Sequence, residues 1–163
     1  MGTLPNDPYK FKIIDDFFLS YILRHSSKHN FDKIYILTGY KSNIIFKKFH
    51  NKIYNFVKVK CIKEKKEMGT GGALFKLKNK VNDFILVNGD TILDIDYSKL
   101  IKVLKKNNYG SIALVKNTNQ ESKKLNYLSL NNNLVKYNER SNLMNGGILF
   151  RRSRNCGRRG DGA

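Results

Sequence analysis

The chain of 163 residues carries 31 basic and 13 acidic side chains, which gives a formal net charge of +18, and 40% of its residues are hydrophobic. This length suits one domain, and the hydrophobic content argues against an intrinsically disordered chain. No apolar run reaches the roughly 18 residues that a membrane-spanning helix needs, so we expect no membrane partner. Cys61 and Cys156 form neither a disulfide framework nor a metal-binding spacing, which favours a cytoplasmic protein.

Hydrophobic patterns predict strands that alternate with helices along the chain. Predicted helices cover residues 18–25, 44–49, 72–77 and 97–106, with Asp15 and Asp16 before the first, and with Ser42 and Asp96 as N-caps of the second and the last. Predicted strands cover 34–38, 57–61, 84–88, 111–115 and 147–150, and three asparagines join 127–130 to 134–137 in a hairpin. This order is typical of an α/β fold with a doubly wound, mostly parallel, Rossmann-like sheet.

The run 84–88 ends in Asn88-Gly89-Asp90, where a glycine interrupts the strand just before a carboxylate. Ligands of open α/β sheets bind beyond the carboxyl ends of the strands. A carboxylate at that edge is commonly met by Mg²⁺, which also binds phosphate oxygens, so the pattern indicates phosphate chemistry on a nucleotide. By itself, Asn-Gly-Asp is also a common turn.

Two further segments carry candidate binding residues. The turn 68–73 contains three glycines, which let a flat ligand approach the backbone and leave free N–H groups where the next helix begins. Such a turn can also be a plain strand-to-helix connection. Glu139 and Asn145, near predicted strand ends, suit hydrogen bonds to sugar hydroxyls, although a charged hairpin end and a turn also explain them.

Taken together, the three segments resemble the motifs of the sugar-phosphate nucleotidyltransferases. The pattern E-x-x-x-M-G-T-G-G-A begins at Glu64, N-G-D-x-x-x-D-I-D at Asn88 and N-G-G-I-L-F at Asn145. These motifs look like the branch of mannose-1-phosphate and D-glycero-D-manno-heptose 1-phosphate guanylyltransferases, and the resemblance covers residues 17–150. It implies transfer of a nucleoside monophosphate from a nucleoside triphosphate to a hexose or heptose 1-phosphate, with release of pyrophosphate, as in nucleotide-sugar biosynthesis for lipopolysaccharide or capsule.

The resemblance also implies a role for each candidate site residue. Asp90 would be the catalytic Mg²⁺ ligand that bridges to the phosphates. The nucleotide would be bound by Glu64, Gly69, Thr70, Gly71, Gly72, Asn88 and Gly89, and the sugar by Glu139, Asn145, Gly146 and Gly147. As a carboxylate, Glu64 only accepts hydrogen bonds, and guanine offers it two adjacent donors, so GTP is the favoured triphosphate.

The chain departs from the family pattern at both ends, and we expect it to be truncated there. We divide it into an irregular segment, 1–16, in place of the family's first strand and G-G-x-G-T-R-L phosphate loop, a nucleotidyltransferase-like domain, 17–150, and a basic disordered tail, 151–163. Loss of that loop, of the P-K-P lysine and of a second acidic metal ligand would remove most of the rate. An uncovered sheet edge would favour self-association into a homo-oligomer.

Two other functions stay open at this point. A truncated chain could bind the nucleotide or the sugar phosphate with little or no turnover. The net charge also allows a basic nucleic-acid-binding protein, but the lysines are scattered and only 151–159 forms a dense cluster. Nucleic acid is therefore the least favoured partner.

Overall fold

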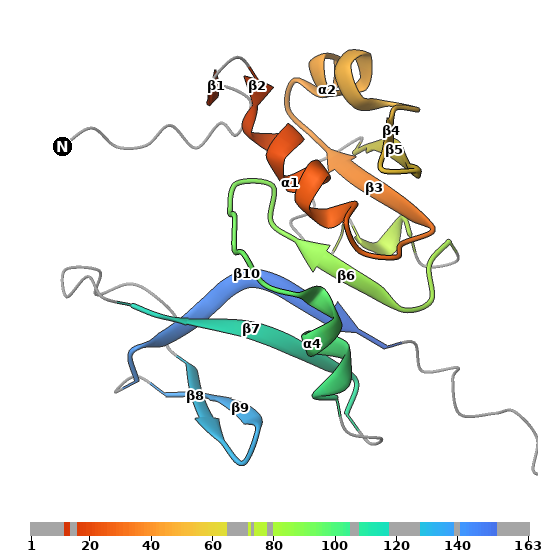
Figure 1. The fold of residues 1–163 in the computed structure, drawn as a ribbon. Coiled ribbons are helices and arrows are strands. Elements are labelled where there is room, and N and C mark those ends of the chain that lie inside the picture. Colours follow the sequence, from red (N-terminus) through yellow and green to blue (C-terminus); the bar gives the residue numbers. More distant parts are fainter. Residues whose placement is uncertain are drawn as a thin grey trace, which may run out of the picture. The chain divides into compact units, whose positions relative to one another are not determined.

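Figure 1 shows the fold in a computed structural model, which describes residues 12–13, 16–64, 72, 74–77, 80–104, 108–117, 128–138 and 141–152. The chain divides into two compact units, Met1–Asn82 and Asp83–Ala163. Most of the segment 1–16 and the tail beyond Arg152 lie outside the described residues, so the expected boundaries and the expected disorder of the tail stay predictions. In the part of the chain that the structure describes, no helix is long and apolar enough to cross a bilayer.

The N-terminal unit is built on a three-stranded sheet. Strands β3 (Lys33–Thr38) and β5 (Val57–Lys63) are parallel neighbours, and β4 (Ile53–Tyr54) pairs with β5 in an antiparallel hairpin. Helices α1 (Phe18–Ser26) and α2 (Ser42–Phe49) precede and follow β3, after a short antiparallel pair of β1 (Lys12–Ile13) and β2 (Asp16–Phe17). The two strands predicted here from hydrophobic runs are confirmed, and they pair in parallel.

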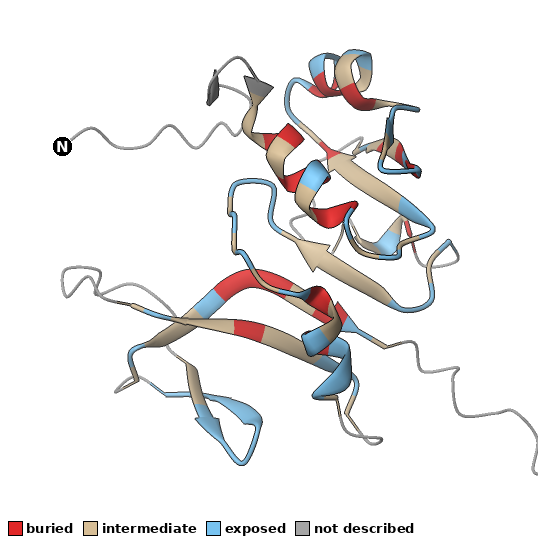
Figure 2. Ribbon diagram, viewed as in Figure 1, coloured by how far each residue is buried: buried red, intermediate tan, exposed pale blue. Residues whose placement is uncertain are grey.

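The core of this unit follows the sequence patterns of β5 and α2. Val57, Val59 and Cys61 are buried and alternate with lysines, as expected for a strand with one covered face. Helix α2 packs on β5 and places Ile45 and Phe49 in full burial. Figure 2 shows buried segments of α1 and α2 in red. Burial of a large apolar side chain contributes about 1.5–3 kcal/mol, so these few contacts hold β5 and α2 together.

Cys61 links β5 to the end of α2. Its backbone N–H donates to Nδ1 of His50 at 3.1 Å, and its Sγ lies 3.9 Å from the Ile45 carbonyl oxygen. The His50 ring also stacks on Phe46, with ring centroids 5.0 Å apart. Burial raises the pKa of the Cys61 thiol to about 11, so this residue is a neutral core side chain at physiological pH.

The first helix begins where it was predicted, since α1 starts at Phe18; Asp16 precedes it in β2, and no acidic residue lies in its first turn. The start of the second helix differs from the prediction. The second helix begins at Ser42 itself, with Lys41 as an N-cap in the left-handed conformation and with no side-chain cap. The physical reason is a turn that hydrophobic patterning did not reveal. The Ser42 N–H donates to the Gly39 carbonyl at 3.3 Å, so Ser42 is the first residue of the helix rather than its N-cap.

The C-terminal unit is organised around one long strand, β10 (Leu143–Arg151). It pairs with β6 (Phe84–Val87) on one side and with β7 (Gly110–Lys116) on the other, antiparallel to both. Strands β6 and β7 therefore run in the same direction, and α4 (Tyr97–Lys102) connects them and packs on β7 and β10 (Figure 1). The antiparallel hairpin of β8 (Leu128–Asn131) and β9 (Leu134–Tyr137) joins the sheet where Leu128 pairs with Leu143.

The α/β class is confirmed, but the mostly parallel arrangement that we expected holds in only part of the described chain. Strands β3 and β5 pair in parallel, whereas the described pairings of β10 are all antiparallel. Strand β10 follows the β8–β9 hairpin and lies between β6 and β7 in the opposite direction. Strand β10 also begins at Leu143, four residues before the predicted start at Gly147.

The turn and the cap predicted in the C-terminal unit are confirmed. Asn132 and Asn133 have positive φ angles, 48° and 62°, as a two-residue hairpin turn of type I′ requires. The Asp96 carboxylate accepts the Ser98 backbone N–H at 2.9 Å and caps α4. Figure 2 shows the hairpin strand β9 in the colour of exposed residues, so it adds little to the core.

Candidate functional site

The residue predicted as the metal ligand lies in the turn that follows β6, which we call the aspartate turn (Asn88-Gly89-Asp90). The Asn88 N–H donates to the Gly147 carbonyl at 2.9 Å and continues the pairing with β10. Asp90 is exposed, and its Oδ1 accepts a hydrogen bond from Thr91 Oγ1 at 3.1 Å. The carboxylate is therefore open to solvent at the carboxyl end of a strand. Sequence reasoning did not include Thr91, although a hydroxyl directly after the aspartate was a usable signal.

A second predicted motif, which we call the glycine bulge (Asn145-Gly146-Gly147), interrupts β10. The register of β10 against β7 shifts between Asn145 and Leu149. Over this stretch β10 advances by four residues while its partner β7 advances by two. Gly147 has a φ of +79°, and Asn145 Oδ1 accepts its backbone N–H at 2.8 Å. Glycine adopts such a φ at little cost, and bulges beside binding sites redirect a strand locally.

Both glycines of the bulge lie too close to neighbouring groups to carry a side chain without movement. A Cβ on Gly146 would stand 3.1 Å from the Leu93 side chain. A Cβ on Gly147 would stand 3.1 Å from Nδ2 of Asn88 and 3.3 Å from the Thr91 side chain. The structure thus brings the glycine bulge into direct contact with the aspartate turn. Because β10 runs antiparallel, its N-terminal half reaches the edge where β6 and β7 end.

The predicted nucleotide-binding residues of the N-terminal unit are described only in part. Glu64 directly follows β5, and its N–H donates to the Thr38 carbonyl at 2.7 Å, so it lies at the carboxyl end of the parallel pair. Its side chain is half-buried, and Gly72 has helical backbone. The other predicted binding residues, Gly69, Thr70, Gly71 and Glu139, lie outside the described residues. The two acidic residues Glu64 and Asp90 belong to different units, so their meeting in one pocket stays a prediction.

The chemistry of the aspartate turn fits a magnesium ion bound together with a phosphate. Mg²⁺ prefers oxygen ligands and usually keeps several waters, with one or two carboxylates and substrate phosphates completing its shell. Asp90 offers one exposed carboxylate of this kind. Among the described residues, no group of three or more histidine, cysteine or acidic side chains could form a protein-only metal site.

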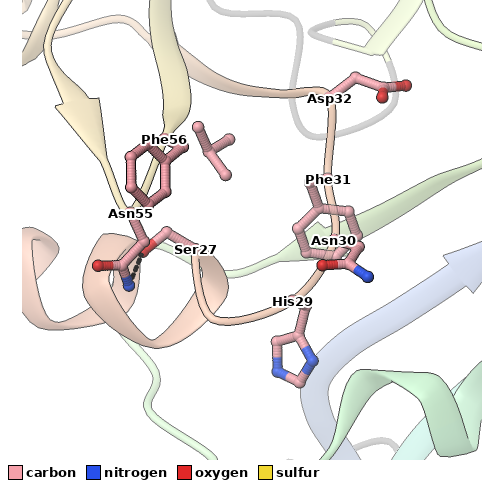
Figure 3. A pocket seen from close by; sticks show the side chains of 8 residues that line it. Ser27, His29, Asn30, Phe31, Asp32, Asn55 and Phe56 are labelled. Atoms are coloured by element: carbon pink, nitrogen blue, oxygen red, sulfur yellow. Dashed lines mark hydrogen bonds between the residues drawn. The ribbon is translucent and has the colours of Figure 1, made fainter.

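A pocket of about 340 Å³ lies elsewhere, at the amino ends of β3 and β5 (Figure 3). It is lined by Ser27, His29, Asn30, Phe31, Asp32, Asn55, Phe56 and Val57. The dashed line in Figure 3 is the bond from Asn55 Nδ2 to Ser27 Oγ, 3.0 Å long. None of the predicted site residues lines this pocket, and Glu64 follows the opposite end of β5. Since ligands of α/β sheets bind beyond the carboxyl ends, we do not assign the predicted chemistry to this pocket.

Comparison with known protein families shows to which family the chain belongs. Residues 5–133 match the model of the family described as nucleotidyl transferase. The chain belongs to this family. The match includes β6, the aspartate turn and Glu64, which carry two of the three motifs found in the sequence.

Curated relatives include two enzymes named D-glycero-alpha-D-manno-heptose 1-phosphate guanylyltransferase. The enzyme from Campylobacter jejuni is 36% identical to this chain, and the alignment covers 54% of this chain and 40% of the enzyme. The enzyme from Aneurinibacillus thermoaerophilus is 32% identical, and the alignment covers 52% of this chain and 37% of the enzyme. The bifunctional protein GlmU of Methanococcus vannielii is 30% identical over 80% of this chain and 32% of its own length. The chain thus spans about two fifths or less of these relatives in each alignment.

Solved structures confirm the nucleotidyltransferase fold. HddC from Yersinia pseudotuberculosis, in a complex with GMP-PN, superposes with a TM-score of 0.70 at 22% identity and covers 93% of this chain and 68% of its own. The inositol-1-phosphate CTP transferase from T. maritima gives a TM-score of 0.64 at 14% identity and covers 89% of this chain and 61% of its own. At these identities the likeness establishes the Rossmann-like fold and not the substrate.

Proposed function

We propose that the protein transfers a nucleoside monophosphate, GMP from GTP by preference, to a hexose or heptose 1-phosphate. The products are a nucleotide-activated sugar and pyrophosphate. The observation that carries the proposal is the contact between the aspartate turn and the glycine bulge at the carboxyl end of β6, in a chain of the nucleotidyl transferase family. The named relatives that act on heptose 1-phosphate support the same chemistry.

The reaction needs positioning and charge neutralisation more than covalent help. A phosphate oxygen of the sugar 1-phosphate forms a bond to the α-phosphorus of the triphosphate, and the bond between that phosphorus and the bridging oxygen to the β-phosphate breaks. Pyrophosphate leaves with the electron pair of the broken bond. Asp90 is the residue that would hold Mg²⁺, which neutralises phosphate charge when bound. The glycine bulge would orient the sugar phosphate, because a hydrogen bond fixes the backbone of Gly147 against Asn88 and Thr91, on either side of Asp90.

The preference for GTP rests on Glu64. Its carboxylate can accept from both N1–H and the amino group of guanine, whereas uracil presents one donor between two acceptors. The substitution Glu64→Gln replaces one acceptor with a donor and should lower turnover with GTP relative to UTP by about tenfold or more. Steady-state rates with GTP, UTP and CTP measure this ratio. An unchanged ratio in E64Q would remove Glu64 from the base pocket while leaving the reaction class intact.

The function itself is tested by pyrophosphate release from the whole chain. GTP, Mg²⁺ and mannose 1-phosphate are mixed with the protein, and heptose 1-phosphate is used in a parallel assay. Release that requires the sugar phosphate supports the proposal. Binding of GTP without any release would instead identify a nucleotide-binding relative with no turnover. The rest of the proposal follows the family chemistry: the enzyme works in the cytoplasm and supplies activated sugars for lipopolysaccharide or capsule.

A further inference from the structure

The outer edge of β5, on the side away from β3, is closed by several different groups. Val59 exchanges two backbone hydrogen bonds of 2.9 Å with the chain before it, at residues 51 and 52. The Cys61 N–H donates to Nδ1 of His50 at 3.1 Å. Every second residue of a strand faces the same edge, so the next residue to face it is Lys63, at the end of the strand.

Lys76 closes the edge at this last position. Its Nζ donates to the Lys63 carbonyl oxygen at 2.8 Å. The Lys76 side chain is half-buried, and the next residue, Leu77, is buried and donates its N–H to the Leu74 carbonyl at 2.9 Å. The segment that carries the ammonium is therefore held by a buried side chain, and it belongs to the same unit as β5.

The Lys63 carbonyl and the Glu64 N–H belong to one planar peptide group. The N–H donates to the Thr38 carbonyl at 2.7 Å, and Thr38 is fully buried. Both polar ends of this peptide are thus bonded, one to a charged donor and the other to the carbonyl of a buried residue. Hydrogen bonds in a chain polarise one another, so the ammonium strengthens the bond to Thr38. The plane of this peptide sets the direction in which the Glu64 side chain leaves the backbone.

We propose that Lys76 is a positioning residue for base recognition: its ammonium fixes the peptide group before Glu64 and thereby directs the Glu64 carboxylate. Lys76 lies beyond the last residue of the motif that begins at Glu64. The part in base recognition rests on the proposed function, whereas the bond that fixes the peptide does not depend on it. Loss of the ammonium should therefore weaken the selection of guanine and loosen the end of β5 locally.

Two substitutions separate the charged donor from the rest of the side chain. Lys76→Met keeps an unbranched, flexible side chain and removes the donor, whereas Lys76→Arg keeps a charged donor. Lys80→Met is the matched control, because Lys80 is exposed and its described bond is a backbone one, from its N–H to the Leu77 carbonyl at 2.8 Å. It removes the same charge four residues further along the chain.

The first measurement is hydrogen exchange at the Glu64 amide in the full chain without nucleotide, compared by NMR with the Cys61 amide of the same strand. We expect K76M to raise the exchange rate at Glu64 about tenfold, as for one lost bond from a charged donor, and to leave Cys61 unchanged. K76R and K80M should protect both amides as the wild type does. Unchanged exchange at Glu64 in K76M, or an equal rise at Cys61, would overturn the positioning role.

The second measurement is equilibrium binding of GTP and of UTP in the presence of Mg²⁺, which needs no turnover. We expect K76M to weaken GTP binding about tenfold and UTP binding by less than about twofold, and K76R to keep the wild-type ratio. An unchanged ratio in K76M would exclude a part in base recognition. If the wild type binds neither nucleotide, the proposed function and that part fail together, and the exchange rates still decide whether Lys76 fixes the peptide.

Discussion

The two acidic residues at the ends of β5 and β6 are held by the fold in different ways. Glu64 belongs to a parallel ladder, since its N–H donates to the Thr38 carbonyl at 2.7 Å and its side chain is half-buried. Asp90 lies in an exposed turn beyond the last bond between β6 and β10, with its carboxylate tied to the neighbouring Thr91 hydroxyl at 3.1 Å. The position of Glu64 thus depends on the regular register of a sheet, and the position of Asp90 depends on an irregular contact between a turn and a bulged strand.

This difference predicts which substitutions should displace each of the two acidic residues. The ladder that positions Glu64 depends on the core beneath β5, so loss of buried apolar volume in the N-terminal unit should loosen it. The turn that carries Asp90 depends on the glycine bulge, so even one added methyl group there should disturb it. Four measurements test this contrast.

The largest effect is expected from Phe49→Ala. Phe49 is fully buried on α2 and meets the Phe17 ring edge-on, with centroids 6.2 Å apart. Truncating a buried phenylalanine costs about 3–5 kcal/mol because it leaves a cavity. Urea unfolding should show this loss, together with faster hydrogen exchange in β3 and β5.

The control for Phe49 is Phe56→Ala. Phe56 is fully exposed in the turn between β4 and β5, so its truncation should change the free energy of unfolding by less than about 0.5 kcal/mol. Equal losses in the two variants would mean that Phe49 is not part of a packed core.

The next effect concerns the glycine bulge. Gly147→Ala forces a side chain into the left-handed region and against the Asn88 and Thr91 side chains, at a cost of about 2 kcal/mol. Exchange should rise in β6 and β10 rather than in β3 and β5. Gly89→Ala provides the stability control, since a Cβ on Gly89 meets nothing within 4 Å. If G147A and G89A are equally stable, the bulge does not support the aspartate turn.

The smallest effect is confined to alkaline pH. The pKa of Cys61 rises from 9.0 to about 11 on folding because the thiol is buried. Between these values the unfolded chain loses the proton first, so the stability of the native state falls as the pH rises. At neutral pH the thiol is protonated in both states and contributes no pH dependence. The urea midpoint of the wild type should fall relative to that of Cys61→Ala between about pH 9 and pH 11, and parallel curves would contradict the assignment.

Much of the N-terminal unit could be predicted because its signals are local. The alternation of Val57, Val59 and Cys61 with lysines predicted one covered face of a strand, and the structure confirms it. The start of α2 was less accessible. The turn before Ser42 depends on Lys41 in a left-handed conformation, which hydrophobic periodicity does not record.

The C-terminal unit shows more clearly which features cannot be predicted from neighbouring residues in the sequence. The cap at Asp96 and the asparagine turn of the hairpin could be predicted, since both depend on neighbouring residues. The direction of β10 and its bulge could not, because they depend on two strands far away in sequence. The aspartate turn was found from the sequence, but its contact with Gly147 appears only in three dimensions.

The role of the carboxylate at the end of β6 is tested by comparing Asp90→Asn with Asp83→Asn. Both substitutions remove one negative charge from an exposed residue flanking β6, but Asp83 lies at the amino end and Asp90 in the aspartate turn. The rate of pyrophosphate release from GTP, Mg²⁺ and mannose 1-phosphate should fall by about 10²–10³-fold in D90N and stay unchanged in D83N. Release by D90N at the wild-type rate would contradict the central claim that the carboxylate at the end of β6 carries the chemistry.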